Sequence, residues 1–273
     1  MQITLAETVL PNGMKIFCLQ KKLVPIIYQQ VQEYLKNGIE LQKGDTVFDI
    51  GANIGLFSLY LYQLYHKNVS IYAFEPIPAI FEVLHRNAQR FDPETIKVFC
   101  CGLSQESKTL NFGYYPNAPV LSTAYPEDSK EVRDRLKKTT LDNLKDLPSA
   151  FRWISWLPPF LRSLILDRIL EKAFQQEQVT CQVKTVSEII REHDIQRIDL
   201  LKVDVEKSEL DVLLGIEEQD WLKIKQIVVE VHDLDHRVEK ITSLLKKNRF
   251  NEMKVEQEQA RKGTNVFNIY AVQ

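Results

Sequence analysis

Val47–Phe57, VFDIGANIGLF, is the stretch that decides the fold. It joins a short apolar run to a turn that contains two glycines, and an apolar helical segment follows. In doubly wound sheets such a turn lies at the carboxyl end of a parallel strand, where ligands bind. Gly51 and Gly55 let the backbone approach a ligand closely, and the helix that follows offers free amide groups. The stretch therefore predicts a ligand-binding loop in an α/β protein.

The chain around this loop alternates between apolar strands and amphipathic helices, which is typical of a parallel sheet covered on both faces. The predicted strands are 46–50, 70–74, 96–100, 198–203 and 226–231, and 252–256 with 266–272 form a closing hairpin. The predicted helices are 55–65, 79–90, 186–193, 208–214 and 235–247. We expect a mostly parallel seven-stranded sheet with helices on both faces.

The 273 residues fit one domain with an insertion. Residues 1–44 form an N-terminal cap, with a hairpin at Pro11-Asn12-Gly13 and a helix from about 25 to 36. The core covers 45–112 and 179–273. Residues 113–178 break the strand and helix rhythm with prolines, charges and an apolar run, so we interpret them as a lid or insertion.

Two acids narrow the choice of ligand. Glu75 ends the second predicted strand, where a carboxylate can accept hydrogen bonds from both hydroxyls of an adenosine ribose. Asp49 precedes the loop, which suits a cationic amino-acid group and would repel the pyrophosphate of a nicotinamide cofactor. The alternatives are that Asp49 only caps the turn and that Glu75 is a solvated charge.

Four blocks follow one another in a familiar order: VFDIGANIGLFSLYL, AFEPIPAIFEVLHRN, IDLLKVDVEKSELDVLLG and IVVEVHD. Over roughly 45–233, apart from the insertion, the chain resembles the FkbM-type methyltransferases. The resemblance implies a Rossmann-like class I methyltransferase fold, S-adenosylmethionine as the methyl donor and usually a hydroxyl group as the acceptor. Members of the family modify polyketides, peptides and sugars, and the long insertion resembles forms from polyketide and nonribosomal peptide pathways.

The resemblance also implies the residues that hold the donor. The family's cofactor positions correspond to Asp49, Gly51, Ala52, Asn53, Gly55, Glu75 and Pro76, and Gly102 and Leu103 are expected near the adenine. The sequence departs from the family at Lys207, where glycine is usual, so we expect the backbone after Glu206 to differ.

The candidate catalytic residues follow two central strands, because the carboxyl ends of parallel strands meet at one edge of a sheet. They are Asp204, Glu206, Glu230 and His232. We predict His232 as the general base, with Glu206 or Asp204 orienting its ring. A structural histidine is the alternative. In a third interpretation Asp204, Glu230 and His232 bind a divalent metal that lowers the pKa of the acceptor.

The insertion contains an apolar surface interrupted by Pro158-Pro159, which predicts two short amphipathic helices. Its members are Trp153, Trp156, Leu157, Phe160, Leu161, Leu164, Ile165 and Leu170. It could cover the active site, pack on the core or lie on a membrane surface. The basic residues Arg133, Arg135, Lys137 and Lys138 could dock a carrier protein, or could form a solvated helix face.

Composition limits the functional classes. The net charge of −2 gives no global positive field, so we expect no nucleic acid partner. The sequence contains no run of about 18 apolar residues, so it predicts no transmembrane segment. Its four cysteines show no CxxC spacing, which suits a reducing cytoplasm. We therefore predict an O-methyltransferase for a small-molecule or carrier-protein-bound hydroxyl, with other synthase domains as further partners. The alternatives are a metal-dependent sugar O-methyltransferase, an N-methyltransferase, a non-catalytic binding module and a nicotinamide-dependent oxidoreductase.

Overall fold

The predicted seven-stranded sheet is the centre of the computed structural model, which describes residues 5–126, 129–142, 144, 152–257 and 264–273. Its strand order is β11-β12-β10-β9-β3-β4-β5, and every pairing is parallel except those of β12 with β10 and β11. The strands are β3 Thr46–Ile50, β4 Ser70–Phe74, β5 Ile96–Phe99, β9 Leu200–Val203, β10 Gln226–His232, β11 Glu252–Glu256 and β12 Val266–Val272. This confirms the predicted Rossmann-like fold class.

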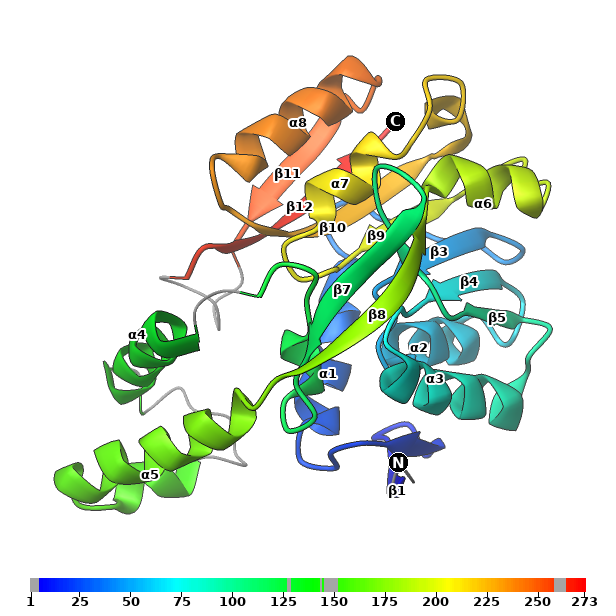
Figure 1. Cartoon of the computed structure of the whole chain (residues 1–273). Helices are drawn as coiled ribbons and strands as arrows, with labels where there is room; N and C mark the ends of the chain where they lie inside the picture. The colour runs from blue at the N-terminus through cyan, green and yellow to red at the C-terminus, as the bar shows by residue number, and fades with distance from the viewer. Residues whose placement is uncertain (1–4, 127–128, 143, 145–151, 258–263) are drawn as a thin grey trace. The chain divides into compact units, whose positions relative to one another are not determined.

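Helices cover both faces of this sheet (Figure 1). They are α2 Leu56–Leu64 and α3 Pro78–Phe91 on one side, and α6 Val186–Glu192, α7 Glu209–Leu214 and α8 Arg237–Lys247 on the other. A 3-10 turn, η5 Trp221–Lys223, precedes β10. The apolar strands are buried, as Phe48 and Phe74 illustrate with no exposed surface. Central strands that are covered on both faces need side chains of this kind.

The N-terminal cap consists of a hairpin and two short helical segments. Strands β1 Ala6–Val9 and β2 Lys15–Cys18 pair in antiparallel fashion. Helix α1 Val24–Gln30 and the 3-10 turn η1 Val31–Tyr34 replace the single longer helix expected from the sequence. Asn87 on α3 holds the hairpin in place through its side-chain amide. The amide oxygen accepts a hydrogen bond from the Phe17 N–H, and the amide nitrogen donates to the carbonyls of Phe17 and Ile54.

A second sheet, with the order β6-β8-β7, was not predicted. Its strands are β6 Gly102–Leu103, β7 Lys108–Tyr114 and β8 Glu177–Lys184. In the first half of β8 polar residues dominate and most of the side chains are exposed, so the apolar pattern that revealed the central strands is missing there. The short β6 pairs with β8 in parallel.

Asn111–Val179 forms a compact unit of its own, and the rest of the chain forms the other. The smaller unit contains the 3-10 turns η2 Pro119–Leu121 and η4 Arg152–Trp156 and the helices α4 Ser129–Asp142 and α5 Pro159–Ala173. The segments η4 and α5 are the two helical pieces expected on either side of Pro158-Pro159. Ile154 and Leu166 are buried, whereas Trp156 is 86% exposed and Phe160 is 68% exposed. Arg135 belongs to the predicted basic group, but its side chain lies outside the described part of the structure.

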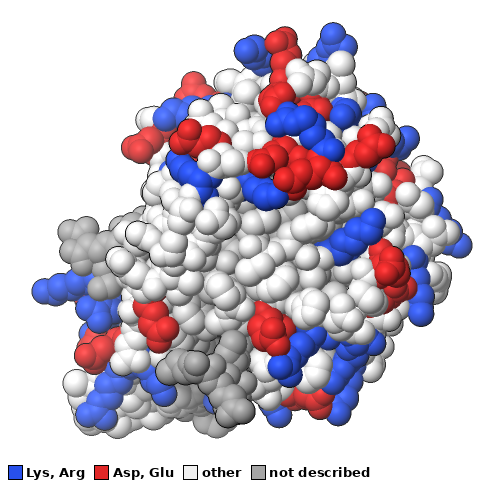
Figure 2. Space-filling view, turned by 45° about the vertical axis from the view of Figure 1, so that its right-hand side comes forward, with Lys and Arg blue, Asp and Glu red and all other residues white. Residues whose placement is uncertain are grey.

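Surface charge and cysteines match the simple expectations from composition. On the face shown in Figure 2, lysine and arginine side chains lie among aspartate and glutamate side chains and do not merge into one basic field. Cys100 is exposed and its neighbour Cys101 is buried, as alternation along an extended segment predicts. Among the described residues, no helix combines the length and the apolar character that crossing a bilayer requires.

Candidate active site

The loop that is predicted to bind the cofactor, residues 51–55, is called the cofactor loop and connects β3 to α2. Gly51 has a φ of +75° and Gly55 a φ of +88°, which are backbone conformations that glycine adopts without strain. A Cβ atom on Gly51 would lie 1.7 Å from the backbone oxygen of Asp204, and one on Gly55 would lie 2.8 Å from Leu84 Cδ1. Gly51 is therefore required by close packing against the backbone of Asp204, a reason that the sequence did not reveal, whereas Gly55 is favoured mainly by its positive φ.

Glu75 holds the loop against the end of β4. Its two carboxylate oxygens accept backbone hydrogen bonds from Asn53, at 3.1 Å, and from Ile77, at 3.0 Å. Burial of the side chain raises the pKa of Glu75 to about 7, although these hydrogen bonds favour the ionised form. Each oxygen keeps further capacity to accept a hydrogen bond. The expected contact with ribose hydroxyls stays a prediction, and the position beside the loop suits it.

Asp49 is fully buried and already has partners. Its Oδ2 accepts a hydrogen bond of 2.7 Å from Ser58, and its Oδ1 lies 3.0 Å from the ammonium of Lys202. Because this side chain has no exposed surface, a ligand does not reach the carboxylate in this arrangement. The direct contact with a cationic ligand therefore stays a prediction, and the geometry assigns Asp49 to the inner support of the loop.

The remaining candidate cofactor residues lie around the end of β4. A Cβ atom on Gly102 would lie 3.4 Å from Pro76 Cβ and 3.1 Å from Val183 Cγ1, so these segments pack closely around Gly102. Leu103 and Ala52 are buried. Pro76 and Gly102, expected in contact with one ligand, are thus neighbours in space.

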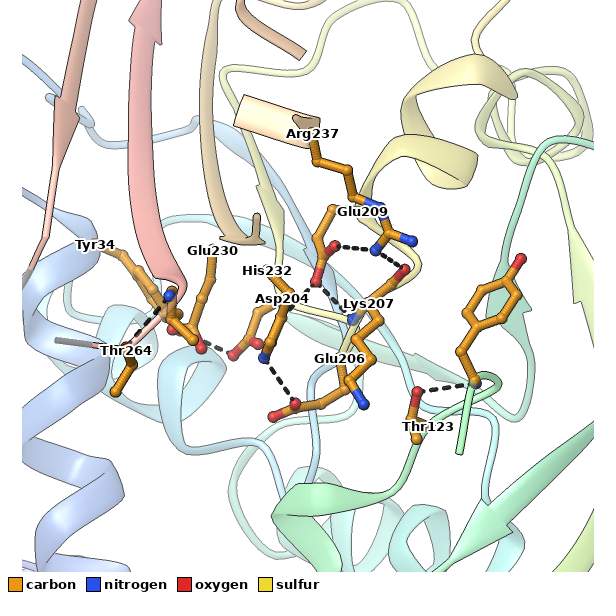
Figure 3. Close-up of polar contacts among 12 residues, drawn as sticks. Tyr34, Thr123, Asp204, Glu206, Lys207, Glu209, Glu230, His232, Arg237 and Thr264 are labelled. Atoms are coloured by element: carbon orange, nitrogen blue, oxygen red, sulfur yellow. Dashed lines mark hydrogen bonds and ion pairs between the residues drawn. The ribbon is translucent and has the colours of Figure 1, made fainter. Parts of the chain in front are cut away.

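A second group of polar residues lies after β9 and at the carboxyl end of β10 (Figure 3). Carboxylate oxygens of Asp204, Glu206 and Glu230 lie within 4.8 Å of one another. The hydroxyl of Tyr34 lies 2.8 Å from Asp204 Oδ2 and 3.3 Å from Glu230 Oε2. Tyr34 comes from η1 in the N-terminal cap, and no sequence pattern linked it to residues so distant along the chain.

His232 lies between two glutamates. Its Nδ1 is 2.9 Å from Glu209 Oε1, and its Nε2 is 3.3 Å from Glu206 Oε2. Burial lowers the pKa of this histidine, but the two carboxylates outweigh burial and raise the pKa to about 10. In this arrangement the protonated form of the ring is favoured at neutral pH, and the role of His232 as a general base stays a prediction.

The turn after Glu206 is held in an unusual conformation. Glu206 and Lys207 have φ values of +48° and +82°, a region that favours glycine. The buried carboxylate of Glu209 accepts a 2.7 Å hydrogen bond from the Lys207 N–H, and Arg237 donates to the Lys207 carbonyl. Lys207 thus has a left-handed backbone, and whether this differs from relatives with glycine at this position stays a prediction.

The comparisons with known proteins identify the family. The model of the methyltransferase FkbM domain matches residues 49–252. The chain belongs to the FkbM methyltransferase family. Members of this family transfer methyl groups from S-adenosylmethionine, so the protein is an S-adenosylmethionine-dependent methyltransferase.

Two relatives of this FkbM-family chain are similar over nearly all of it. The 31-O-demethyl-FK506 methyltransferase FkbM of Streptomyces tacrolimicus is 33% identical over 96% of this chain and 95% of its own length. The AMB antimetabolite synthetase AmbE of Pseudomonas aeruginosa is 33% identical over 97% of this chain, which spans 12% of AmbE. A solved S-adenosylmethionine-dependent O-methyltransferase from Thermotoga maritima aligns with 98% of this chain and 77% of its own, at 10% identity and a TM-score of 0.45.

Four residues of the FkbM-family site were not identified from the sequence: Tyr34, Ser58, Lys202 and Glu209. Lys202 carried a signal, because it is the one charged residue of the apolar strand LLKV. Glu209 begins a helix, where an acid is common without any catalytic role.

Proposed function

We propose that this FkbM-family methyltransferase methylates a hydroxyl group of a natural-product intermediate, with His232 as the general base. The observation that carries the proposal is the pairing of His232 with Glu209, past the sheet edge at which the cofactor loop lies. A buried carboxylate on Nδ1 orients the ring and leaves Nε2 as the proton acceptor, as in hydrolase triads.

The base must first lose its proton. In the described arrangement the Glu206 carboxylate contacts Nε2, and together with Glu209 it keeps the pKa of His232 at about 10. The Glu206 side chain is 26% exposed, so an acceptor hydroxyl can take its place. Removal of one carboxylate from the ring lowers the pKa of His232 towards the working range of a base.

We assign the donor to the cofactor loop and Glu75. Bound S-adenosylmethionine supplies the methyl group at this site. The loop residues 51–55 border the ligand, Glu75 accepts hydrogen bonds from the ribose, and Pro76, Gly102 and Leu103 lie beside the adenine. Glu75 fits this task because it is 5% exposed and its oxygens retain acceptor capacity.

The acceptor class rests on the relatives. One is named for FK506 and the other for an antimetabolite synthetase, so a polyketide or peptide hydroxyl, free or attached to a carrier protein, is the class that we propose. The exposed Trp153, Trp156 and Phe160 of the smaller unit offer an apolar surface for such a partner.

Mass spectrometry of reactions with a panel of hydroxyl and amine acceptors, free and carrier-bound, tests the proposal. We expect methylation of a hydroxyl acceptor. His232→Ala should leave S-adenosylhomocysteine binding intact and slow transfer by about a hundredfold or more. Methylation of amines alone would refute the oxygen acceptor. Full activity of His232→Ala would refute the role of His232 as the general base.

A metal-assisted reaction on a sugar or another small molecule is the second candidate, because three carboxylates converge beside His232. The set differs from the one expected from the sequence. Glu206 joins Asp204 and Glu230, while both ring nitrogens of His232 face glutamates. Calorimetry with magnesium alone, and transfer assays with and without a chelator, test this candidate. Unchanged activity after chelation and no heat of magnesium binding would dismiss it.

A further inference from the structure

Lys202 is a buried cation in the middle of the sheet. It is 3% exposed, and its neighbours in β9 are the apolar residues Leu201 and Val203. Lysine is almost never buried to this degree without partners, because removing an ammonium group from water is costly. The contacts of its Nζ atom therefore indicate what keeps it there.

These contacts lie on three consecutive residues where β3 enters the cofactor loop. Nζ donates a hydrogen bond of 2.9 Å to the Gly51 carbonyl, lies 3.3 Å from the Ile50 carbonyl and lies 3.0 Å from Asp49 Oδ1. The strand register explains the reach, since Lys202 lies directly opposite Asp49. The ammonium thus makes hydrogen bonds to the two carbonyls and an ion pair with Asp49.

The same ammonium also faces the catalytic acids. It lies 3.8 Å from Asp204 Oδ2 and 5.6 Å from the centre of the Tyr34 ring. The Tyr34 ring in turn packs edge-on against Phe57 of α2, with 5.5 Å between the ring centres. One cation, Lys202, thus lies beside both the inner side of the cofactor loop and the acid cluster, which consists of Asp204, Glu206 and Glu230.

We propose that Lys202 is a positioning residue for the methyl donor, whose ammonium fixes the Ile50 and Gly51 carbonyls and thereby the shape of the cofactor loop. This role goes beyond neutralising Asp49. With these carbonyls held inward, the turn keeps the conformation that places Asn53 next to Glu75. The proposal rests on the assignment of the loop to the donor.

The experiment separates loop positioning from charge neutralisation. It compares two variants that both lack the Asp49 carboxylate and that differ in whether Lys202 is present. Asp49→Asn is compared with the double variant Asp49→Asn, Lys202→Met, so that the two proteins differ only in the ammonium group of Lys202. Calorimetry with S-adenosylhomocysteine gives the affinity, and thermal unfolding shows that each variant is folded. Lys184→Met is the matched control, because Lys184 is also a strand lysine bonded to a carboxylate, that of Glu192.

We expect the double variant to bind S-adenosylhomocysteine at least tenfold more weakly than Asp49→Asn, and Lys184→Met to bind like the wild type. Equal affinity of Asp49→Asn and the double variant would show that Lys202 only balances Asp49 and would overturn the proposal. A wild-type protein that does not bind S-adenosylhomocysteine would refute the donor assignment itself, and with it the role of Lys202. The single variant Lys202→Met is not needed, so its possible failure to fold does not affect the outcome.

Discussion

The charge of His232 is set by its two glutamate neighbours. A histidine with a folded pKa near 10 and an ordinary value of 6.5 stabilises the fold below pH 6.5, and this stabilisation is lost as the pH rises through 10. The loss over the whole interval amounts to up to about 5 kcal/mol. Urea denaturation at pH 7 and pH 9 should show a larger fall in the free energy of unfolding for the wild type than for His232→Gln. Equal falls would contradict the prediction.

Glu206 provides a matched test of the same charge. Because its carboxylate raises the pKa of His232, Glu206→Gln should lower the titration midpoint of that histidine. Nuclear magnetic resonance of the ring protons measures the midpoint directly. Glu256→Gln is a suitable control, since Glu256 pairs with Lys254 instead. An unchanged midpoint in Glu206→Gln would show that Glu206 does not contact the ring in solution.

Glu75 should make donor binding depend on pH. Its pKa of about 7 means that the carboxylate is half protonated near neutrality, and the ionised form accepts hydrogen bonds from hydroxyls better. Affinity for S-adenosylhomocysteine should therefore rise between pH 6 and pH 8. In Glu75→Gln the affinity should be lower and the dependence absent. Calorimetry at three pH values tests this, and a flat wild-type profile would rule out Glu75 as the titrating group.

Single residues also show where inference from the sequence ended. Glu75 and His232 could be placed because each follows an apolar strand, and strand ends meet at one edge. Tyr34 could not be placed, since it meets Asp204 across 170 positions of sequence and no periodicity encodes that contact. The protonation of His232 depends on side-chain distances, which sequence spacing does not supply.

Gly51 links the element scale to the site, because it lies where β3, the loop and β9 meet. Gly51→Ala should abolish S-adenosylhomocysteine binding and lower the melting temperature strongly, since the new Cβ would collide with the backbone of Asp204. Gly13→Ala is the control. Its φ of +86° carries a similar strain, but nothing lies within 4 Å of the added atom, so the cost should be about 1–2 kcal/mol. Similar melting temperatures for both variants would refute the packing argument.

At this scale the central sheet followed from the sequence and the smaller sheet did not. The strands of the large sheet are short apolar runs bounded by turns, and this pattern survives without tertiary context. The first four residues of β7 and the first four of β8 are largely exposed, and β6 has only two residues. The hydrophobic pattern therefore gave no sign of them.

At the scale of the whole molecule, stability should depend on the buried residues of the smaller unit far more than on its exposed residues. Ile154 is 1% exposed, so Ile154→Ala should destabilise by about 2–5 kcal/mol. Trp156 is 86% exposed, so Trp156→Ala should change stability by less than about 0.5 kcal/mol. Urea denaturation followed by circular dichroism measures both. A large loss in Trp156→Ala would mean that this ring is covered in solution.

The reach of Tyr34 has a consequence for how the protein folds. Its hydroxyl contacts Asp204 and Glu230, which lie 170 and 196 positions further along the chain. Forming contacts of such long range closes a long loop and costs conformational entropy, so these contacts slow folding. The acid cluster depends on contacts about as distant in sequence as those that pair β3 with β9, so a refolding chain should regain its local helices before it regains a competent active site.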